Sequence, residues 1–597
     1  MKILIQKIIY DPMSLYRFFL ELLKSIKIKL RISYFGPYNI RYYPKEIREI
    51  SLRFKSDINL NQYHQDKWDI FNFNSGSNNE SIYLAGTKVS DSEIMDLWEN
   101  KNSSEYDDET VNLAYRFHWL LEKLASDCSY SQLKIFYKMI VECQKKITYR
   151  KNCVSLSPYN ISERICNLVV FASIAYKHSC IDNEEFQNIR LIIKNDLLCL
   201  KENLEYPASG IINNHIVNNA RALYIGGCFL NLQDSIHLSK AILKKHLPEM
   251  IGKGGFLKEA SSHYQLLLTK NILEVSIIAE QFNDQEFYEW ISSLSRKMVY
   301  ASEKLIPKQL KSLRNFPTIG DISPDIPLGW FDPREHNNEG LWNKLWKQSS
   351  TTYNRKESYE ENNGWYSVNE KNWFVLAYSH PSRKEYPAGH GHRDFGSFIL
   401  YDNGTPMIID IGRYTYNKSK SLTPIGNEAT SHSSVILNQR EPLYSGERLK
   451  KIFKTNPNFK KHFNMSQNNS NSSADWKSQF FWEVIEHDYQ WSRALKVVND
   501  KKIVISDSYN ALEIEGFLYF SKYIKILSKK KNSLILELND KFNFLLTING
   551  IDHYEIENTD YFPSYGLRSK TKRLRWNKKN PRLEEDNINI SIIKVRK

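Results

Sequence analysis

Three segments of the sequence combine residue types that can do chemistry. The first, residues 213–219, holds four asparagines and His215 at the start of an expected helix. Asparagine is a poor residue inside a helix and a good N-cap, so an interpretation in which Asn213 or Asn214 caps the helix stays open. His215 and Asn218 are three residues apart and therefore share one helix face. The segment is either a capped helix start or part of a polar site.

The second segment, residues 254–265, places two glycines before a helix whose first turn carries His263 and Tyr264. Alone, this pattern says little, because a tyrosine on a helix is usually half-buried in a core.

The third segment has the most specific pattern. A His-x-His-x-Asp run starts at His390, and Asp410 and His432 follow it. Two histidines and one carboxylate at strand ends can bind a divalent metal, for which we expect zinc, with an oxygen or water as fourth ligand. Alternate side chains of a strand share a face, so if only His392 binds the metal, His390 can face a substrate.

Amphipathic helices must carry the first two segments. Between about residues 91 and 303, apolar residues recur at three- and four-residue spacing, as in Leu113, Phe117 and Leu120. A run of antiparallel helices indicates an α/α toroid or a solenoid, and the missing fixed period disfavours the solenoid. The expected helices are 110–125, 132–146, 161–176, 183–203, 213–230, 234–245 and 262–281.

Strands must carry the third segment. Prolines and glycines mark a crossing region over 307–353, and Asp402-Asn403-Gly404 between two apolar runs predicts a hairpin. The expected strands are 373–378, 397–401, 407–411, 502–507, 519–527, 534–539, 542–548 and 589–595.

The predicted fold is therefore an α+β, multidomain one: an N-terminal α/α toroid (an incomplete barrel) followed by a C-terminal antiparallel β-sandwich. We expect a lead-in over 1–90 with a basic amphipathic helix at 13–32, the toroid over 91–330, a crossing loop over 331–365 and the sandwich over 366–597. The asparagine- and serine-rich stretch 456–473 predicts a long mobile loop.

Composition limits the possible partners. The chain has 597 residues, 41% of them apolar, and a formal charge of +14. The charge suits an acidic polysaccharide, a membrane surface or nucleic acid, although codon bias is a sufficient cause. The basic run 568–582 around Trp576 is either a polyanion surface or a solvated face, and it lacks a nucleic-acid motif, so we expect no nucleic-acid partner.

The cysteines and the N-terminus bear on the compartment. All seven cysteines lie between residues 128 and 228 without a CxxC pair, which favours buried reduced thiols. No secretory signal is evident, so a cytoplasmic location is expected, with a periplasmic or membrane-associated one as the alternative. The helix at 13–32 either packs on the body or makes a peripheral membrane contact.

The order of these motifs resembles the heparinase II/III family of polysaccharide lyases, which is related to several alginate lyases. The motifs are the Asn-His helix start, Gly-Gly-x-x-x-Glu-x-x-x-x-Tyr, His-x-His-x-Asp-x-x-Ser-Phe, Asp-x-Gly-x-Tyr-x-Tyr, the isolated Ser-His and an upstream Pro-Tyr-x-x-Ser-x-Arg-x-x-Asn. The resemblance spans Pro158 to His432. It implies the toroid-plus-sandwich fold and β-elimination on a uronate-containing polysaccharide.

The resemblance also implies roles for single residues. Asn214 and His215 would neutralise the uronate carboxylate or help take the proton, and Tyr264 would act as general acid and possible base. His390 would face the substrate and Tyr414 would support the reacting sugar. The expected metal ligands are His392, Asp410 and His432, around a structural ion, and the expected substrate-binding residues are Asn218 and Arg393.

Three positions depart from the family pattern, namely Gly391, Arg393 and Ile411, and some members carry Glu where Asn218 stands. Two other functions stay open: an accessory protein of capsule or surface-polysaccharide assembly that binds or trims an acidic glycan, and a hydrolase using Glu259 and Asp394 as paired carboxylates. The sequence specifies neither the polymer nor an oligomeric state.

Overall fold

The structure is a computed structural model. It describes residues 39–53, 65–68, 82–99, 105–120, 130–147, 153–210, 212–310, 315–325, 364–370, 372–378, 390–417, 428–439, 489–582 and 584–595, with the short pieces 23, 25–30, 346, 426, 460–462 and 478–486.

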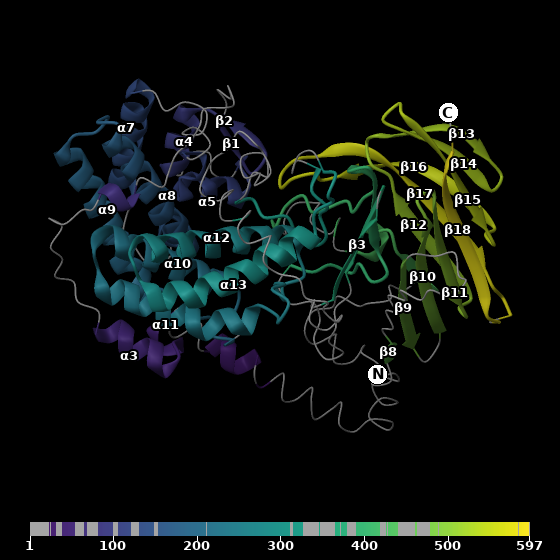
Figure 1. Ribbon diagram of the computed structural model, residues 1–597, viewed down its shortest axis with the longest axis horizontal. Coiled ribbons are helices and arrows are strands. Elements are labelled where there is room, and N and C mark those ends of the chain that lie inside the picture. Colours follow the sequence, from purple (N-terminus) through teal and green to yellow (C-terminus); the bar gives the residue numbers. More distant parts are fainter. Residues whose placement is uncertain are drawn as a thin grey trace.

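Helices form the first half of the chain and strands the second, and the halves lie side by side (Figure 1). The helix expected over 110–125 is interrupted at Phe117, which takes a left-handed conformation with φ of 56°. The longer helices are α3 (Lys45–Arg53), α4 (Asp91–Trp98), α5 (Asp108–Arg116), α7 (Tyr130–Lys146), α8 (Pro158–Lys177), α9 (Asn183–Glu202), α10 (Asn214–Leu230), α11 (Gln233–Met250), α12 (Ser262–Gln281) and α13 (Gln285–Lys304).

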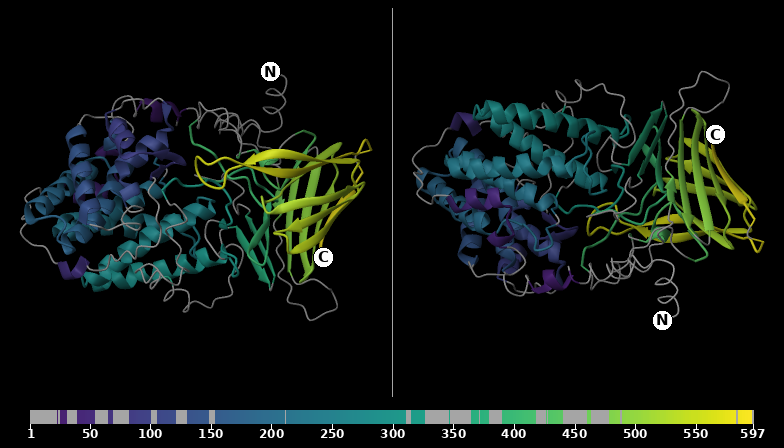
Figure 2. Two further views of the ribbon diagram at one scale, coloured as in Figure 1. Left: turned by 90° about the horizontal axis from the view of Figure 1, so that it is seen from above. Right: turned by 90° about the horizontal axis from the view of Figure 1, so that it is seen from below.

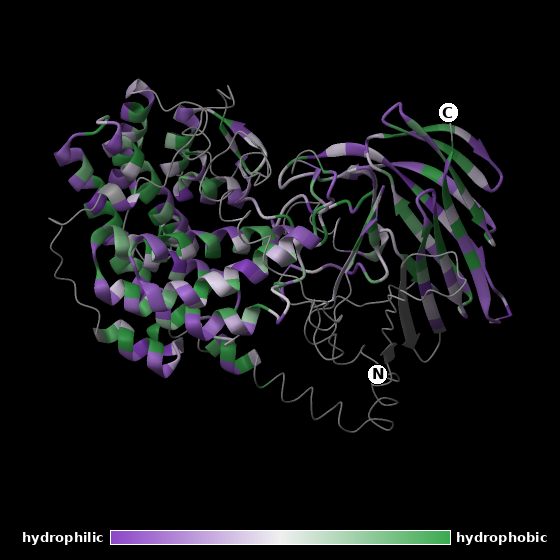
Figure 3. Cartoon of the chain, viewed as in Figure 1, coloured by the Kyte–Doolittle hydropathy of each residue, from purple (hydrophilic) through white to green (hydrophobic). Residues whose placement is uncertain are grey.

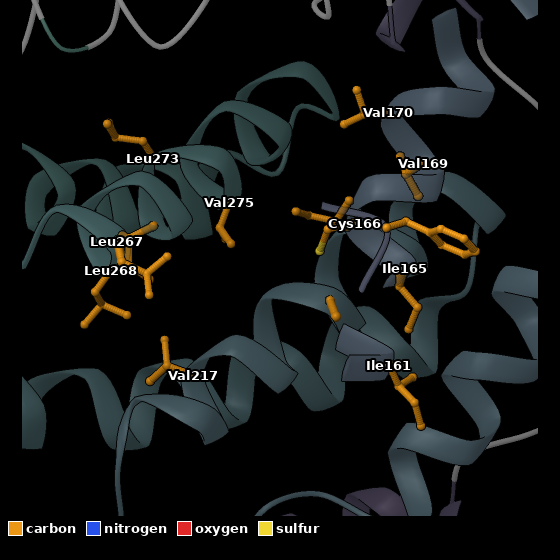
Figure 4. Packing of buried hydrophobic residues seen from close by; sticks show 14 of the residues in the cluster. Ile161, Ile165, Cys166, Val169, Val170, Val217, Leu267, Leu268, Leu273 and Val275 are labelled. Carbon is orange, nitrogen blue, oxygen red and sulfur yellow. The ribbon is translucent and has the colours of Figure 1, made fainter. Parts of the chain in front are cut away.

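The helices pack in two layers. The inner helices α8, α10 and α12 contact one another in sequence, and α9, α11 and α13 cover them from outside. Helix α12 is buried at every residue from Ser262 to Ala279, whereas α13 buries only one stripe. Figure 4 shows buried side chains of the inner helices, among them Ile165, Val217 and Val275, which belong to one hydrophobic cluster. Figure 3 shows hydrophilic and hydrophobic residues mixed along the helices, as amphipathic packing requires. This arrangement is the predicted α/α toroid.

The strands of the second half pair antiparallel throughout. They form an eight-stranded sheet in the order β13-β14-β15-β18-β11-β10-β9-β8 and two four-stranded sheets, β16-β17-β12-β7 and β3-β4-β5-β6; a separate β1-β2 hairpin belongs to the first half. Their bounds are β1 (Ile82–Leu84), β2 (Thr87–Val89), β3 (Trp365–Glu370), β4 (Trp373–Tyr378), β5 (Phe398–Asp402), β6 (Thr405–Ile408), β7 (Val435–Leu437), β8 (Lys460–His462), β9 (Ser478–Glu486), β10 (Tyr489–Asn499), β11 (Lys502–Tyr509), β12 (Glu513–Tyr519), β13 (Ile524–Lys530), β14 (Ser533–Leu538), β15 (Phe542–Asn549), β16 (His553–Tyr561), β17 (Ser569–Lys579) and β18 (Asp586–Val595).

One expected strand is divided in two. The apolar run 519–527 crosses from β12 into β13 through a turn in which the Ile524 amide donates to the Ser521 carbonyl at 3.1 Å. Periodicity alone does not reveal such a turn, because apolar residues continue through it.

The β3-β4-β5-β6 sheet joins the two halves. Figure 2 shows it between the helices and the eight-stranded sheet. All of β4 is buried, with Phe374 and Leu376 in the core shared with the helices and Trp373 and Val375 in the core of the sandwich. The two-residue period of a strand thus places alternate side chains in two different cores.

The basic run 568–582 contains strand β17. Its cations face carboxylates on neighbouring strands: Arg573 pairs with Glu557 on β16, and Arg575 pairs with Glu515 on β12. These ion pairs favour the solvated-face interpretation of the run.

Several expectations fall on other parts of the chain. The helix expected over 13–32, the crossing loop over 331–365 and the loop over 456–473 lie for the most part outside the described residues. The helices within the described ranges include none long and apolar enough to cross a bilayer. The described cysteines are free thiols, and Cys128 lies outside the described residues.

Candidate active site and metal centre

The starts of two inner helices bring two of the motif residues to the junction of the halves. Asn213 caps α10, since its side chain accepts from the His215 amide at 3.2 Å. Ser261 caps α12, accepting from the Tyr264 amide at 3.1 Å. Capping by Asn213 leaves the side chain of Asn214 available for other contacts.

Asn214 lies between Glu259 and His390. The Asn214 backbone amide donates to Glu259 Oε1 at 2.9 Å, and its Nδ2 donates to Glu259 Oε2 at 2.5 Å. The same Nδ2 lies 3.3 Å from His390 Nε2. Asn214 and Glu259 are buried, whereas the His390 side chain is 18% exposed. Solvent therefore reaches this group at the histidine.

Tyr264 stacks on His390, with ring centroids 3.5 Å apart and planes inclined by 12°. Its hydroxyl lies 3.0 Å from the Tyr416 hydroxyl, which donates to the Ile322 carbonyl at 2.9 Å. Because the Tyr416 proton is engaged there, Tyr264 is the donor between the two hydroxyls. Burial raises the pKa of Tyr264 well above its ordinary value, so the phenol is neutral and can serve as an acid.

His215 lies at the open edge of the site, with 37% of its side chain exposed. Its Nδ1 is 3.1 Å from Glu205 Oε1, and its ring centroid is 4.7 Å from that of Tyr159. Burial favours the neutral imidazole, but the charge and hydrogen bond of Glu205 raise the pKa of His215 above its ordinary value.

Arg116, Asp325 and Tyr159 add a buried charged group beside His215. Arg116 Nη1 donates to Asp325 Oδ1 at 2.5 Å, and the Tyr159 hydroxyl donates to Asp325 Oδ2 at 2.9 Å. The Arg116 guanidinium also lies over the Tyr159 ring at 4.7 Å. The sequence predicts no role for these residues, although Tyr159 belongs to the upstream motif.

Asn218 is only 1% exposed and belongs to a network inside the toroid. Its Oδ1 accepts from Arg221 Nη1 at 2.9 Å, and Arg221 also binds Glu163 and Glu274. The described contacts therefore place Asn218 among the inner helices rather than beside His390.

The predicted metal ligands converge. His392, Asp410 and His432 are buried, and one ligand atom of each lies within 4.8 Å of those of the others. His432 Nδ1 is 2.5 Å from Asp410 Oδ2. His392 Nδ1 is buried and makes no hydrogen bond to any described residue. Buried polar atoms normally have a partner, and a metal ion would supply one here. Two imidazoles and a carboxylate suit a divalent metal such as zinc, so the residues fit the expected group.

Asp394 and Arg393 lie in the same loop. Asp394 is buried, and burial raises its pKa to about 6. Its charge interactions are with His392, His432 and Asp410, whereas Glu259 bonds to Asn214, so these carboxylates belong to different groups. Arg393 is partly buried.

Tyr414 and Tyr416 lie on different sides of their segment. The Tyr414 ring packs against Phe562, which lies in the connection between β16 and β17, with ring centroids 5.5 Å apart. Both belong to a small apolar cluster of the sandwich. Tyr416, two residues on, reaches the Tyr264 hydroxyl. The structure thus brings Asn214, Tyr264 and Tyr416 to the junction and places the Tyr414 ring elsewhere.

Asp321 is a residue of this site that sequence reasoning missed. This buried carboxylate accepts from His390 Nδ1 at 3.1 Å, His392 Nε2 at 2.8 Å and Arg413 Nη1 at 2.9 Å. Burial alone would raise its pKa, but hydrogen bonds from both histidines and the Arg413 charge hold it well below the ordinary value. The only sequence signal was an aspartate after Gly320 in a Pro-rich region, which also describes an ordinary turn.

Arg493 on β10 fixes two of the loops that carry the metal ligands. Its Nη1 donates to the carbonyls of Gly396 at 3.0 Å and Ser433 at 2.8 Å. Asp507 holds the guanidinium in place at 2.7 and 3.0 Å. The eight-stranded sheet thereby sets the spacing between the His392 and His432 loops.

Comparison with known proteins agrees with this architecture. Residues 355–592 match the family model described as heparinase II/III-like, C-terminal, which confirms the resemblance inferred from the motifs. No curated protein matches the sequence.

Solved structures match over most of the chain. A crystal structure of heparinase III is 13% identical, with a TM-score of 0.59, covering 96% of this chain and 91% of that one. Another heparinase III gene product is 14% identical, with a TM-score of 0.56, covering 92% and 88%. A mutant of the heparan sulfate lyase of Pedobacter heparinus is 13% identical, with a TM-score of 0.53, covering 92% and 87%. These likenesses confirm the predicted fold of a toroid followed by a β-sandwich.

Proposed function

We propose that this chain, which carries a heparinase II/III-like C-terminal domain in the fold of heparinase III, is a polysaccharide lyase that cleaves a uronate-containing polymer by β-elimination. One observation carries the proposal: Asn214, Tyr264 and His390, from three distant segments, meet within contact distance at the junction of the halves. The family match and the acidic polysaccharides expected from the +14 charge agree with it.

The reaction removes the proton at C5, next to the uronate carboxylate, and expels the oxygen at C4. Negative charge develops on the carboxylate side, so hydrogen-bond donors must face it. Asn214 Nδ2, beside His390, and His215, whose pKa is raised, suit this role.

The reaction needs a base for the C5 proton and an acid for the leaving oxygen. Tyr264 suits the acid, because its high pKa keeps the phenol proton available for the leaving oxygen. His390 Nε2 suits proton transfer from C5, because Nδ1 faces Asp321 and Nε2 is the remaining nitrogen of a side chain that is 18% exposed. A divalent ion held by His392, Asp410 and His432 would supply fixed positive charge that ties three loops together. β-Elimination consumes no water, so no residue at the junction has to activate a water molecule.

The test is direct. The purified protein is mixed with alginate, glycosaminoglycans and bacterial capsular polymers, and the ultraviolet absorbance of the conjugated alkene product is followed. We expect absorbance to rise with at least one uronate polymer and not with a neutral one. No rise in absorbance with any of these polymers contradicts the proposal. Glycan binding without product would favour an accessory role in surface-polysaccharide assembly. Sugar products that lack the alkene would favour a hydrolase.

A further inference from the structure

The crossing segment 315–325 is attached to both halves at Asp321. Ser261 Oγ donates to the Asp321 carbonyl at 2.7 Å, and the Asp321 amide donates to the His390 carbonyl at 2.8 Å. The preceding Gly320 has φ of +78°, and a Cβ there would lie 2.4 Å from the Ala260 carbonyl oxygen. Glycine thus lets the segment pass between the start of α12 and the His390 loop, so the backbone itself fixes the place of Asp321.

The contacts of Asp321 set the protons on both histidines. Arg413 Nη1 lies 2.9 and 3.0 Å from the two Asp321 oxygens, and a carboxylate paired with a guanidinium accepts hydrogen bonds and donates none. His390 therefore carries a proton on Nδ1, and His392 carries one on Nε2. The opposite nitrogens are left as acceptors: His390 Nε2 faces Asn214 Nδ2, and His392 Nδ1 is the buried nitrogen of the metal group.

Arg413 connects the same carboxylate to the tyrosines. Its Nη1 lies 2.9 and 3.0 Å from the two oxygens of Asp321, and its guanidinium lies over the Tyr416 ring at 4.8 Å. Tyr416 in turn accepts from Tyr264. One carboxylate therefore contacts the metal group, the histidine beside Asn214 and the cation that supports the tyrosine pair.

We propose that Asp321 is a positioning residue that couples the metal centre to the reacting groups, by holding His392 ready to bind the ion and His390 ready to take a proton. The part of this inference that concerns proton transfer by His390 rests on the proposed function; the part that concerns metal binding by His392 does not. A carboxylate that accepts from a metal-ligating histidine orients the ring and strengthens it as a ligand. By the same contact, a carboxylate orients a histidine that transfers protons. Through Asp321, an ion bound at His392 would affect His390, although the ion itself does not contact the substrate.

The test compares Asp321→Asn with Asp325→Asn. The amide at 321 keeps the volume but loses the charge and turns an NH₂ toward one of its partners. Asp325 is another buried aspartate of the same segment, bonded to Arg116 and Tyr159 rather than to the metal group. Zinc affinity is measured by competition with a chromophoric chelator, and kcat and KM are measured on the polymer that the wild-type protein cleaves.

For Asp321→Asn we expect zinc to bind about 10- to 100-fold more weakly and kcat to fall by a similar factor, with a smaller change in KM. Asp325→Asn should bind zinc as the wild type does. An Asp321→Asn variant with unchanged zinc affinity and unchanged kcat overturns the proposal. A wild type that binds zinc and cleaves nothing contradicts the proposed function, and zinc affinity then decides the role of Asp321.

A measurement on the wild-type chain guards against a variant that fails to fold. Zinc is added to metal-free protein, and the ring signals of His390 are followed by NMR, assigned with His390→Gln. Coupling through Asp321 predicts that these signals move as zinc binds, although His390 is not among the ligands. Signals that stay fixed through saturation with zinc overturn the proposal, as does a wild type that takes up no zinc.

Discussion

Asp196 and Asp321 are both buried carboxylates, and they use their oxygens differently. Asp196 on α9 binds Arg164 on α8 through two hydrogen bonds of 2.8 Å, and neither side chain is exposed. Asp321 divides its oxygens among two histidines and Arg413. The first pair joins two helices, and Arg164 Nη1 also donates to the Ser155 carbonyl at 3.0 Å. In the second arrangement, His390 Nε2 and His392 Nδ1 do not contact Asp321, so each histidine keeps one ring nitrogen for a substrate or a metal ion.

The difference also appears in the surroundings. The Asp196 pair lies within the toroid, where helices of one domain pack on one another. The Asp321 group lies where segments of both halves meet, and junctions of domains are common places for ligand sites. Removing a residue of the first kind should therefore change stability, and removing one of the second should change chemistry.

The largest expected effect is at Tyr264. Tyr264→Phe removes the proposed acid and should lower kcat by about 10²- to 10⁴-fold. The free energy of unfolding should change little, because the ring stays in place on His390. Steady-state rates and urea unfolding measure the two effects. Tyr554→Phe, which removes a buried hydroxyl bonded to the Lys530 and Ser533 carbonyls in the sandwich, is the matched control and should keep its rate. A Tyr264→Phe variant as fast as wild type refutes the assignment.

Asp196→Asn tests the structural side of the comparison. Loss of the carboxylate leaves Arg164 buried without its charge partner, which should cost about 3–5 kcal/mol of unfolding free energy. The kcat per folded molecule should stay at the wild-type value. Urea unfolding followed by circular dichroism gives the first quantity and active-site-normalised rates give the second. A large loss of kcat in the folded variant would mean that the two carboxylates do not differ as argued.

Replacing the tyrosines of the Asp-x-Gly-x-Tyr-x-Tyr segment separates two assignments. Tyr416→Phe removes the acceptor of the Tyr264 hydroxyl, and a hydrogen bond contributes about 0.5–1.5 kcal/mol, so kcat should fall by up to about tenfold. Tyr414→Phe should have the smaller effect, because the Tyr414 ring packs against Phe562. If the order of the two effects is reversed, the role that the resemblance implied for Tyr414 is the better one.

The smallest effect concerns pH. Glu205 outweighs burial and raises the pKa of His215, so NMR titration should give a midpoint above about 6.5, and Glu205→Gln should lower it. A raised pKa in the folded state means that this pair stabilises the protein fully below about pH 6.5 and that its contribution is lost as the pH rises through the folded pKa. A midpoint at or below the ordinary value would show that burial dominates instead.

Local patterns predicted much of the fold. The helix expected over 262–281 has those bounds in the structure, and the strand expected over 373–378 is β4. Both succeed because apolar spacing reports directly on the face that an element buries. Apolar spacing failed for the helix over 110–125 and the strand over 519–527. A left-handed residue at Phe117 and a turn at Ser521 interrupt these elements, but the apolar pattern continues through both.

The candidate site was predicted in part. Asn214, His390 and the ligands of the metal group belong to motifs, and the structure brings them together at the junction. The choice between Tyr414 and Tyr416 could not be read from their spacing, because residues two apart in an extended segment share a face only when the segment does not twist or turn. Here Gly412 and the loop after it carry the two rings to different neighbours.

The sequence by itself determined the two kinds of secondary structure, their order and the residue types able to donate protons or bind a metal, because each depends on neighbours within a few positions. Only the tertiary structure decided that Asp321 lies between His390 and His392, residues 69 and 71 positions away. No local pattern specifies such a contact, since it follows from how the crossing segment packs against α12 and the loop before β5. A buried carboxylate becomes a shared acceptor only when packing removes water and leaves it these donors.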